Sequence, residues 1–247
     1  MEVLAIIGGA IAGLDFAGML AGYVFGKSID VVLAKLAKLK KDTWQKQLVH
    51  ALFLSLNEVH MGSFENSLEL HQKSLLIYEK AHRLEHPDTA TAYNNIGTCY
   101  RAMGNHEKAL ELHQKALAIR EKVHGKEHPD TAQSYNNLGV MHNNMGNHEK
   151  ALEMHQKALA IREKVLGLEH PDTAMTYGHL GLLYYSLKQY DKALDWNLRA
   201  YKAWTHVLGE KHPLTQIAFR NTRSVFAANG RKAKDFAGWL EEQLLQG

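Results

Sequence analysis

The chain has only one cysteine, Cys99, and only four prolines among its 247 residues. A single cysteine cannot form an internal disulfide, and it is compatible with a reducing compartment such as the cytoplasm. Because proline is excluded from helix interiors, its scarcity permits long helical segments. The four prolines recur in one kind of loop, at Pro87, Pro129, Pro171 and Pro213.

The chain also carries little excess of charge of either sign. The net charge is only +3, and no basic patch with interleaved aromatic residues occurs. We therefore do not expect nucleic acid as a partner. The sequence also has no nucleophile elbow, no phosphate-binding loop and no carboxylate pair in a defined pocket, so neither an enzyme nor a cofactor is predicted.

What the sequence does contain is a repeat. The segment EHPDTA starts at Glu85, Glu127 and Glu169, and a degraded copy, KHPLTQ, starts at Lys211, always 42 residues apart. The blocks 85–126 and 127–168 are identical at 31 of 42 positions. Fixed periods of this size indicate helical solenoids, whose units bury their apolar faces by stacking. Such an array favours binding over catalysis.

Each unit reads as two helices. Apolar residues at spacings of three and four, as at Tyr93, Ile96 and Tyr100, predict the first helix. Gly104 marks the turn, and a second helix with small residues at Ala109 and Ala116 follows. Proline suits the first position of the next helix, so the HPDTA segment is interpreted as a helix start.

These features resemble the tetratricopeptide repeat (TPR). The resemblance rests on Gly97 with an aromatic residue three positions later, on Ala-x-x-x-His-x-x-Ala over 109–116, and on the Leu-Gly-x-x-His-Pro-Asp-Thr-Ala connector over 166–174. The connector and the long period look like the kinesin light chain type, although no sustained heptads precede the repeats here. The resemblance covers roughly residues 43–245 and implies an all-α, right-handed solenoid of helix hairpins.

We accordingly expect two parts. Residues 1–42 form an apolar and amphipathic helical segment, and residues 43–247 form the solenoid. Its five predicted hairpins are 43–84, 85–126, 127–168, 169–210 and 211–247.

The resemblance also implies where a ligand binds. In TPR proteins the inner surface is built from the first helices of the hairpins, and the middle of that surface here would be rich in asparagine. Asparagine offers donors and an acceptor, so it can pair with the backbone of an extended peptide. The alternative is that these asparagines are solvated consensus residues. The predicted peptide-binding residues are Asn94, Asn95, Arg101, Asn136, Asn137, Asn143, Asn144, His179 and Tyr185, with Thr98, Val140, Gly178 and Leu182 in the same register.

Sixteen histidines invite a metal hypothesis. Most are explained by repetition, and equivalent residues of successive repeats should lie roughly 10 Å apart, too far to share one ion. No metal site and no short His/Cys/Asp cluster is therefore expected. The two equivalent series are His71, His113 and His155, and His86, His128, His170 and His212.

The first repeat differs because its predicted inner surface is apolar. Exposing so many large side chains is unfavourable, so something should cover them. The nearest candidate is the amphipathic stretch 29–39, for which a membrane-surface role is the alternative. The apolar residues concerned are Val49, Leu52, Phe53, Leu56 and Val59.

Residues 3–25 hold a single charged group, Asp15. As one helix they would span about 35 Å, enough for a bilayer core, and the lysines that follow would keep the repeats on the cytoplasmic side. A charged Asp15 at mid-span costs about 2.5–3.5 kcal/mol unless it is paired. Membrane insertion is therefore an open alternative, as is a transient targeting role.

Glycines in this segment form two stripes of small residues that suit close helix packing. On a straight helix the two stripes face opposite sides. Either the segment breaks near Gly13 and Asp15 caps another helix, or it packs between copies of itself in a ring or filament. The residues concerned are Gly9 and Gly13 in one stripe and Gly18, Gly22 and Gly26 in the other.

We therefore expect a non-enzymatic, cytoplasmic scaffold that forms a homo-oligomer through its N-terminal helices and binds a protein or an extended peptide on its repeats. The alternative is a membrane-anchored or pore-forming protein whose N-terminal helix is controlled by the repeats.

Overall fold

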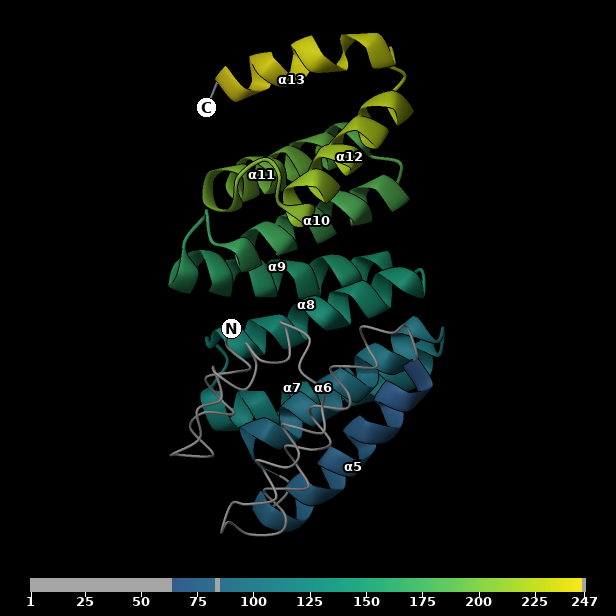
Figure 1. Cartoon of the computed structure of the whole chain (residues 1–247), viewed down its shortest axis with the longest axis vertical. Coiled ribbons are helices and arrows are strands. Elements are labelled where there is room, and N and C mark those ends of the chain that lie inside the picture. The colour runs from purple at the N-terminus through teal and green to yellow at the C-terminus, as the bar shows by residue number, and fades with distance from the viewer. Residues whose placement is uncertain (1–63, 83–84, 246–247) are drawn as a thin grey trace, which may run out of the picture. The chain divides into compact units, whose positions relative to one another are not determined.

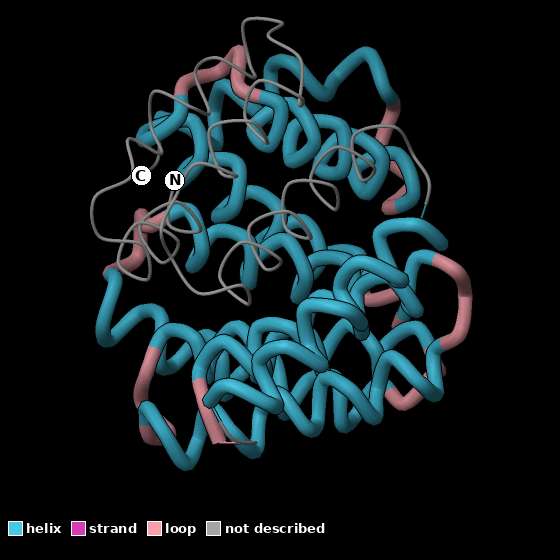
Figure 2. Tube along the Cα trace, turned by 60° about the horizontal axis from the view of Figure 1, so that its bottom comes forward, coloured by secondary structure: helices cyan, strands magenta, loops and turns pink. Residues whose placement is uncertain are grey.

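The computed structural model describes residues 64–82 and 85–245. Within these ranges every regular element is a helix and no strand occurs (Figure 2), so the predicted all-α class is confirmed. No helix in the described ranges combines the length and the hydropathy that a bilayer crossing requires. The expectations for residues 1–63, which include both glycine stripes and the apolar inner face of the first repeat, lie outside the described residues.

The chain divides into two units, residues 1–81 and 82–247. The first unit contributes α5 (Phe64–His82). The second contains α6 (Pro87–Ala102), α7 (His106–His124), α8 (Pro129–Asn144), α9 (His148–Leu166), α10 (Pro171–Ser186), α11 (Tyr190–Leu208), α12 (Pro213–Ala228), the short 3-10 helix η1 (Ala233–Asp235) and α13 (Phe236–Leu245).

Helices of the second unit pack as consecutive hairpins, with α6 on α7, α8 on α9 and α10 on α11. The hairpins stack in chain order through α7 on α8, α9 on α10 and α11 on α12 (Figure 1). This is the predicted solenoid. It places the first helix of each hairpin, α6, α8 and α10, next to the corresponding helix of its neighbour in the stack.

The HPDTA segment starts a helix, as expected. In each copy the histidine is the N-cap residue and proline occupies the first turn. The Nδ1 atom of His128 accepts a hydrogen bond of 3.1 Å from the backbone N–H of Asp130, which satisfies one of the free N–H groups at the helix start. This cap explains one of the two recurring histidine series in structural terms.

The other histidine series packs against glycine. A Cβ atom added to Gly97 would lie 3.1 Å from the ring of His113, and one added to Gly139 would lie only 2.6 Å from the ring of His155. Both rings are 1% exposed. The glycine of each first helix therefore makes room for a ring from the second helix of the same hairpin.

Two buried arginines join neighbouring hairpins. Arg120 on α7 donates from Nη1 to the carbonyl of Asp130 and to the hydroxyl of Ser134, both at 2.9 Å. Arg162 on α9 makes the equivalent bonds to the carbonyl of Asp172 at 2.7 Å and to Thr176 at 2.8 Å. These contacts fix the start of α8 and of α10, and so the spacing of the inner helices.

The C-terminal end of the stack is closed by aromatic residues. Phe226 and Phe236 are buried, and their ring centroids lie 5.4 Å apart. Lys232 and Lys234 are exposed to solvent, as the outer face of a terminal repeat requires. Leu244, one residue before the end of α13, is 42% exposed.

Candidate functional site

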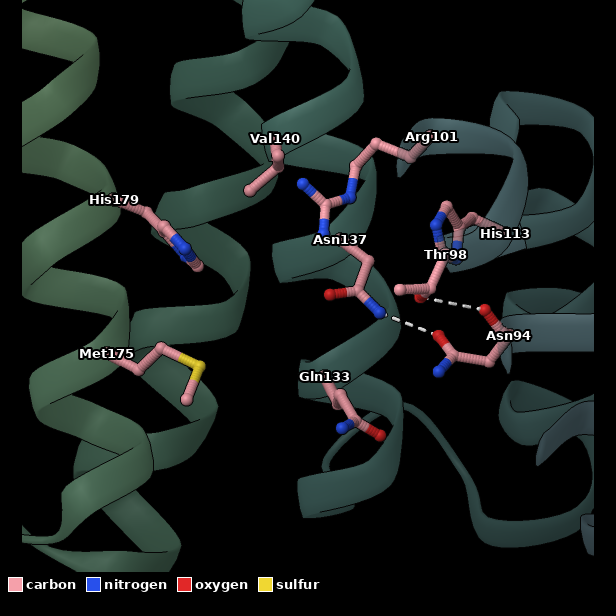
Figure 3. A pocket seen from close by; sticks show the side chains of 9 residues that line it. All are labelled: Asn94, Thr98, Arg101, His113, Gln133, Asn137, Val140, Met175 and His179. Carbon is pink, nitrogen blue, oxygen red and sulfur yellow. Dashed lines mark hydrogen bonds between the residues drawn. The ribbon is translucent and has the colours of Figure 1, made fainter. Parts of the chain in front are cut away.

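A cavity of about 280 Å³ lies among α6, α8 and α10 on their inner side, with one wall contributed by α7 (Figure 3). It is open to solvent, and most of its wall is polar. The residues that line it are Asn94, Thr98, Arg101, His113, Gln133, Asn137, Val140, Met175 and His179.

A hydrogen bond that recurs with the repeat joins neighbouring first helices at this cavity. Asn137 Nδ2 on α8 donates to Asn94 Oδ1 on α6 at 2.6 Å (Figure 3). One repeat later, His179 Nδ1 on α10 lies 3.0 Å from Asn136 Oδ1 on α8. These bonds hold the inner helices in register. The bond between Asn137 and Asn94 uses only one polar atom of each side chain, so Asn94 Nδ2 and Asn137 Oδ1 take no part in it.

The two buried histidines of the second helices are not equivalent in their bonding. His155 Nδ1 lies 3.1 Å from Asn136 Oδ1. The same atom of His113 is buried and has no hydrogen-bond partner among the described residues. The equivalent asparagine, Asn94, accepts from Asn137. An unpaired buried nitrogen is costly. The side chain that carries it lines the solvent-connected cavity.

The cavity carries one permanent charge. Burial, followed by the nearby Arg101 and Arg120, lowers the pKa of His113 to about 4. Burial, followed by Arg162 and Arg101, lowers the pKa of His179 to about 4. Both rings are therefore neutral at pH 7. Arg101 is exposed and is the only charged side chain among the lining residues, so the local field favours an anion.

Four of the nine predicted peptide-binding residues line the cavity, namely Asn94, Arg101, Asn137 and His179. The other five lie outside it. Asn136 is 1% exposed and holds two histidine rings, so it faces the interior and not the groove. Asn95 and Asn143 are half-buried, and Asn144 and Tyr185 are exposed.

Three lining residues were not among the predicted ones. Gln133 and Met175 lie one helical turn before Asn137 and His179, so the four-residue helical spacing could have found them. His113 comes from a second helix. It reaches the cavity because Gly97 has no side chain, a signal present in the sequence as the Gly97 and His113 pair.

Comparisons with known proteins identify the fold. A family model for the tetratricopeptide repeat matches residues 48–122, 93–164, 130–205 and 172–234, which together span well over half of the chain. No curated relative matches.

Solved structures give the same result. A kinesin light chain type protein of Podosopora anserina with nearly identical TPR-like repeats is 24% identical over 80% of this chain and 92% of that chain, with a TM-score of 0.62. BtubC from P. vanneervenii is 20% identical over 83% and 93%, with a TM-score of 0.57. A Rap protein complexed with competence and sporulation factor is 16% identical over 87% and 56%, with a TM-score of 0.71. At these identities the likeness establishes the fold.

Proposed function

Because the chain belongs to the tetratricopeptide repeat family, we propose that it is a non-enzymatic scaffold that binds an extended peptide, or an extended segment of a partner protein, along the inner surface of α6, α8 and α10. The observation that carries this proposal is the cavity of about 280 Å³ on that surface, with its mixture of amides, one arginine and an unpaired histidine nitrogen. A solenoid fold alone names no partner, so the chemistry of this wall has to define it.

The polar wall fits a peptide backbone. The amide groups of Asn94, Asn137 and Gln133 offer both donors and acceptors, which an extended backbone requires. The neutral ring of His113 adds one further donor or acceptor, according to its tautomer. The Rap relative, solved with competence and sporulation factor, offers a precedent for ligand binding by this fold.

The charge and the apolar part of the wall define the side chains of the peptide. Arg101 can hold a carboxylate in a charge-assisted, two-pronged hydrogen bond. Val140 and Met175 provide the apolar part of the wall. Farther along α10, Leu182 is 45% exposed and Tyr185 43% exposed. We therefore propose a ligand with an acidic residue and an aliphatic or aromatic residue.

Peptides selected from a random library on the full chain test the proposal. Replacing Asn137 with alanine should weaken the selected peptides about tenfold, roughly 1–2 kcal/mol for one hydrogen bond to a peptide group. Asn95→Ala is the matched control, because Asn95 lies outside the cavity and its loss should leave affinity unchanged. Equal affinity of both variants, with unchanged helicity, would place the ligand elsewhere.

We propose in addition that copies of the chain assemble through the N-terminal glycine stripes, Gly9 with Gly13 and Gly18 with Gly22 and Gly26. Small residues at four-residue spacing let two helices approach closely, which supports a ring or filament. Size measurement on the full chain and on a chain starting at Thr43 tests this. The full chain should be an oligomer and the shortened chain a monomer. Two monomers would refute self-assembly.

The membrane alternative rests on the same segment, whose only charged group over residues 3–25 is Asp15. Flotation with liposomes separates it from self-assembly. A full chain that stays soluble without detergent or lipid and does not float would exclude insertion and support a cytoplasmic scaffold.

A further inference from the structure

The loop between α7 and α8 brings together three side chains that can ligate a metal ion. They are His124 at the end of α7, the N-cap residue His128, and Asp130 in the first turn of α8, and their ligand atoms lie within 4.8 Å of one another. The expectation that no short cluster of this kind occurs was therefore wrong. That expectation considered only equivalent positions of successive repeats, whereas this cluster lies at one junction between two helices.

The geometry points to a site for a divalent cation such as zinc. His124 Nε2 lies 3.7 Å from Asp130 Oδ2, and His128 Nδ1 lies 3.6 Å from the same oxygen. Ligand atoms of one tetrahedral zinc ion lie roughly 3.3–3.5 Å apart, since each is about 2.0–2.2 Å from the metal. The carboxylate oxygen is therefore within a few tenths of an ångström of the required spacing from each nitrogen. The three ligand atoms as a set lie within 4.8 Å of one another, so the two nitrogens also have to approach each other when an ion binds.

The chemistry of the three groups selects the class of cation. Two imidazoles and one carboxylate suit zinc, nickel and copper, whereas magnesium and calcium prefer oxygen ligands alone. Three protein ligands leave at least one coordination position for water or for a group of a partner.

A metal ion would compete with a hydrogen bond that His128 already makes. The Nδ1 atom of His128 accepts the N-cap hydrogen bond from Asp130, and this nitrogen has one lone pair. A metal held through Nδ1 therefore replaces the cap, which makes the site weaker than one with free ligands. The positive charge of Arg120, which donates to the carbonyl of Asp130, weakens it further.

His124 has a histidine as its counterpart in the preceding repeat, at position 82, but not in the two repeats that follow. The pair formed by the N-cap histidine and the aspartate recurs one repeat later as His170 and Asp172. The position equivalent to His124 is Leu166 in that repeat and Leu208 in the following one. In the structure the His124 ring stacks on His128, with centroids 4.3 Å apart and an angle of 16° between the ring planes. The lone pairs of an imidazole lie in its ring plane, so one ring has to turn out of this stack before both can hold the same ion. The spacing His-x-x-x-His-x-Asp occurs once more in the sequence, at 82–88.

A bound cation would link the end of α7 to the first turn of α8. Gln133, which lines the inner cavity, lies in the next turn of the same helix. The site would therefore stabilise the part of α8 from which the inner surface begins, although metal binding itself does not depend on the proposed peptide function.

Calorimetric titration of the full chain with zinc chloride near pH 7 tests the site, with magnesium chloride as the cation control. Replacing His124 with leucine, the residue that the next repeat has, should remove one equivalent of bound zinc and leave the fold intact. Replacing Leu166 with histidine completes the same three ligands one repeat later and should add one equivalent. Zinc should also raise the melting temperature of the wild type more than that of H124L.

H124L that binds as many equivalents of zinc as the wild type would overturn the site, because the zinc would then be held by other histidines. A wild-type chain that binds no zinc would overturn it as well.

Discussion

The two fully buried rings, His113 and His155, are expected to lower the free energy of unfolding by about 4 kcal/mol, roughly 2 kcal/mol each, on acidification from pH 7 to about pH 4.5. Burial, then His179 and Arg162, lowers the pKa of His155 to about 3, and the pKa of His113 is about 4. The unfolded chain takes up a proton at each ring near pH 6.5, while the folded chain does not. The stabilising contribution is therefore complete above pH 6.5 and is lost as the pH falls toward the folded-state values.

Denaturant unfolding of the full chain at a series of pH values measures this loss. A matched variant exists within the chain, because α11 has Asn197 where α9 has His155, packed in the same way against Gly181. The double variant H113N/H155N should lose the part of the pH dependence between pH 6.5 and 4.5 that these two rings contribute, whatever its stability at pH 7. The part that His179 contributes should remain, because its pKa is also lowered to about 4. A wild-type stability that is flat over this range would show that the two rings are protonated in the folded state.

Gly139→Ala is expected to destabilise the chain by about 1–2 kcal/mol. Alanine inside a helix is normally favoured over glycine by about 1 kcal/mol, but overpacking a filled core costs roughly 1–3 kcal/mol. The added Cβ would lie 2.6 Å from His155 Cε1 and 2.7 Å from Nδ1. The ring cannot move aside easily, because Asn136 bonds to it and His179 stacks on it with centroids 5.6 Å apart.

Gly97→Ala is the control for this prediction. Its Cβ would lie 3.1 Å from the ring of His113, so a shift of a few tenths of an ångström relieves the contact, and the Nδ1 atom of this ring has no partner to hold it. G97A should be close to neutral, since the helix preference offsets the strain. Equal losses for the two variants in urea unfolding would show that the close approach at Gly139 is not the cause.

The helical architecture could be predicted well from the sequence, because the same residues that start and end helices recur in each repeat. Pro129 and Pro171 start helices, and Gly125 and Gly167 stand at helix C-caps with φ values of 85° and 90°. One turn could not be predicted in this way. Gly104 and Gly146 form the turn after the first helix of their hairpins, but the equivalent position after α10 is Lys188, which adopts a φ of 58° although it is not glycine.

The candidate site could be predicted only in part. Helix register identified Arg101 and Asn137, since exposure on a first helix follows from spacing alone. It could not distinguish Asn136 from Asn137, because one residue of rotation decides whether an amide bonds to a buried histidine or faces the cavity. The contribution of His113 depends on packing between helices, which spacing along one helix does not report.

The histidines also show that the repeat pattern does not reveal contacts between neighbouring helices. Repetition assigned them correctly to recurring structural positions, where His128 and His170 cap helices. It did not reveal that His124 stacks on His128 beside Asp130, because that contact joins the end of one helix to the start of the next.

The central claim is that Arg101 and the inner surface bind the acidic residue of an extended peptide. A double-mutant cycle tests it directly, using a peptide selected on the full chain, its Glu→Gln or Asp→Asn counterpart, the wild-type chain and R101Q. We expect the wild type to prefer the acidic peptide about tenfold and R101Q to lose that preference, a coupling of about 1.4 kcal/mol. An undiminished preference for the acidic peptide in R101Q, or selected peptides without acidic residues, would contradict the claim.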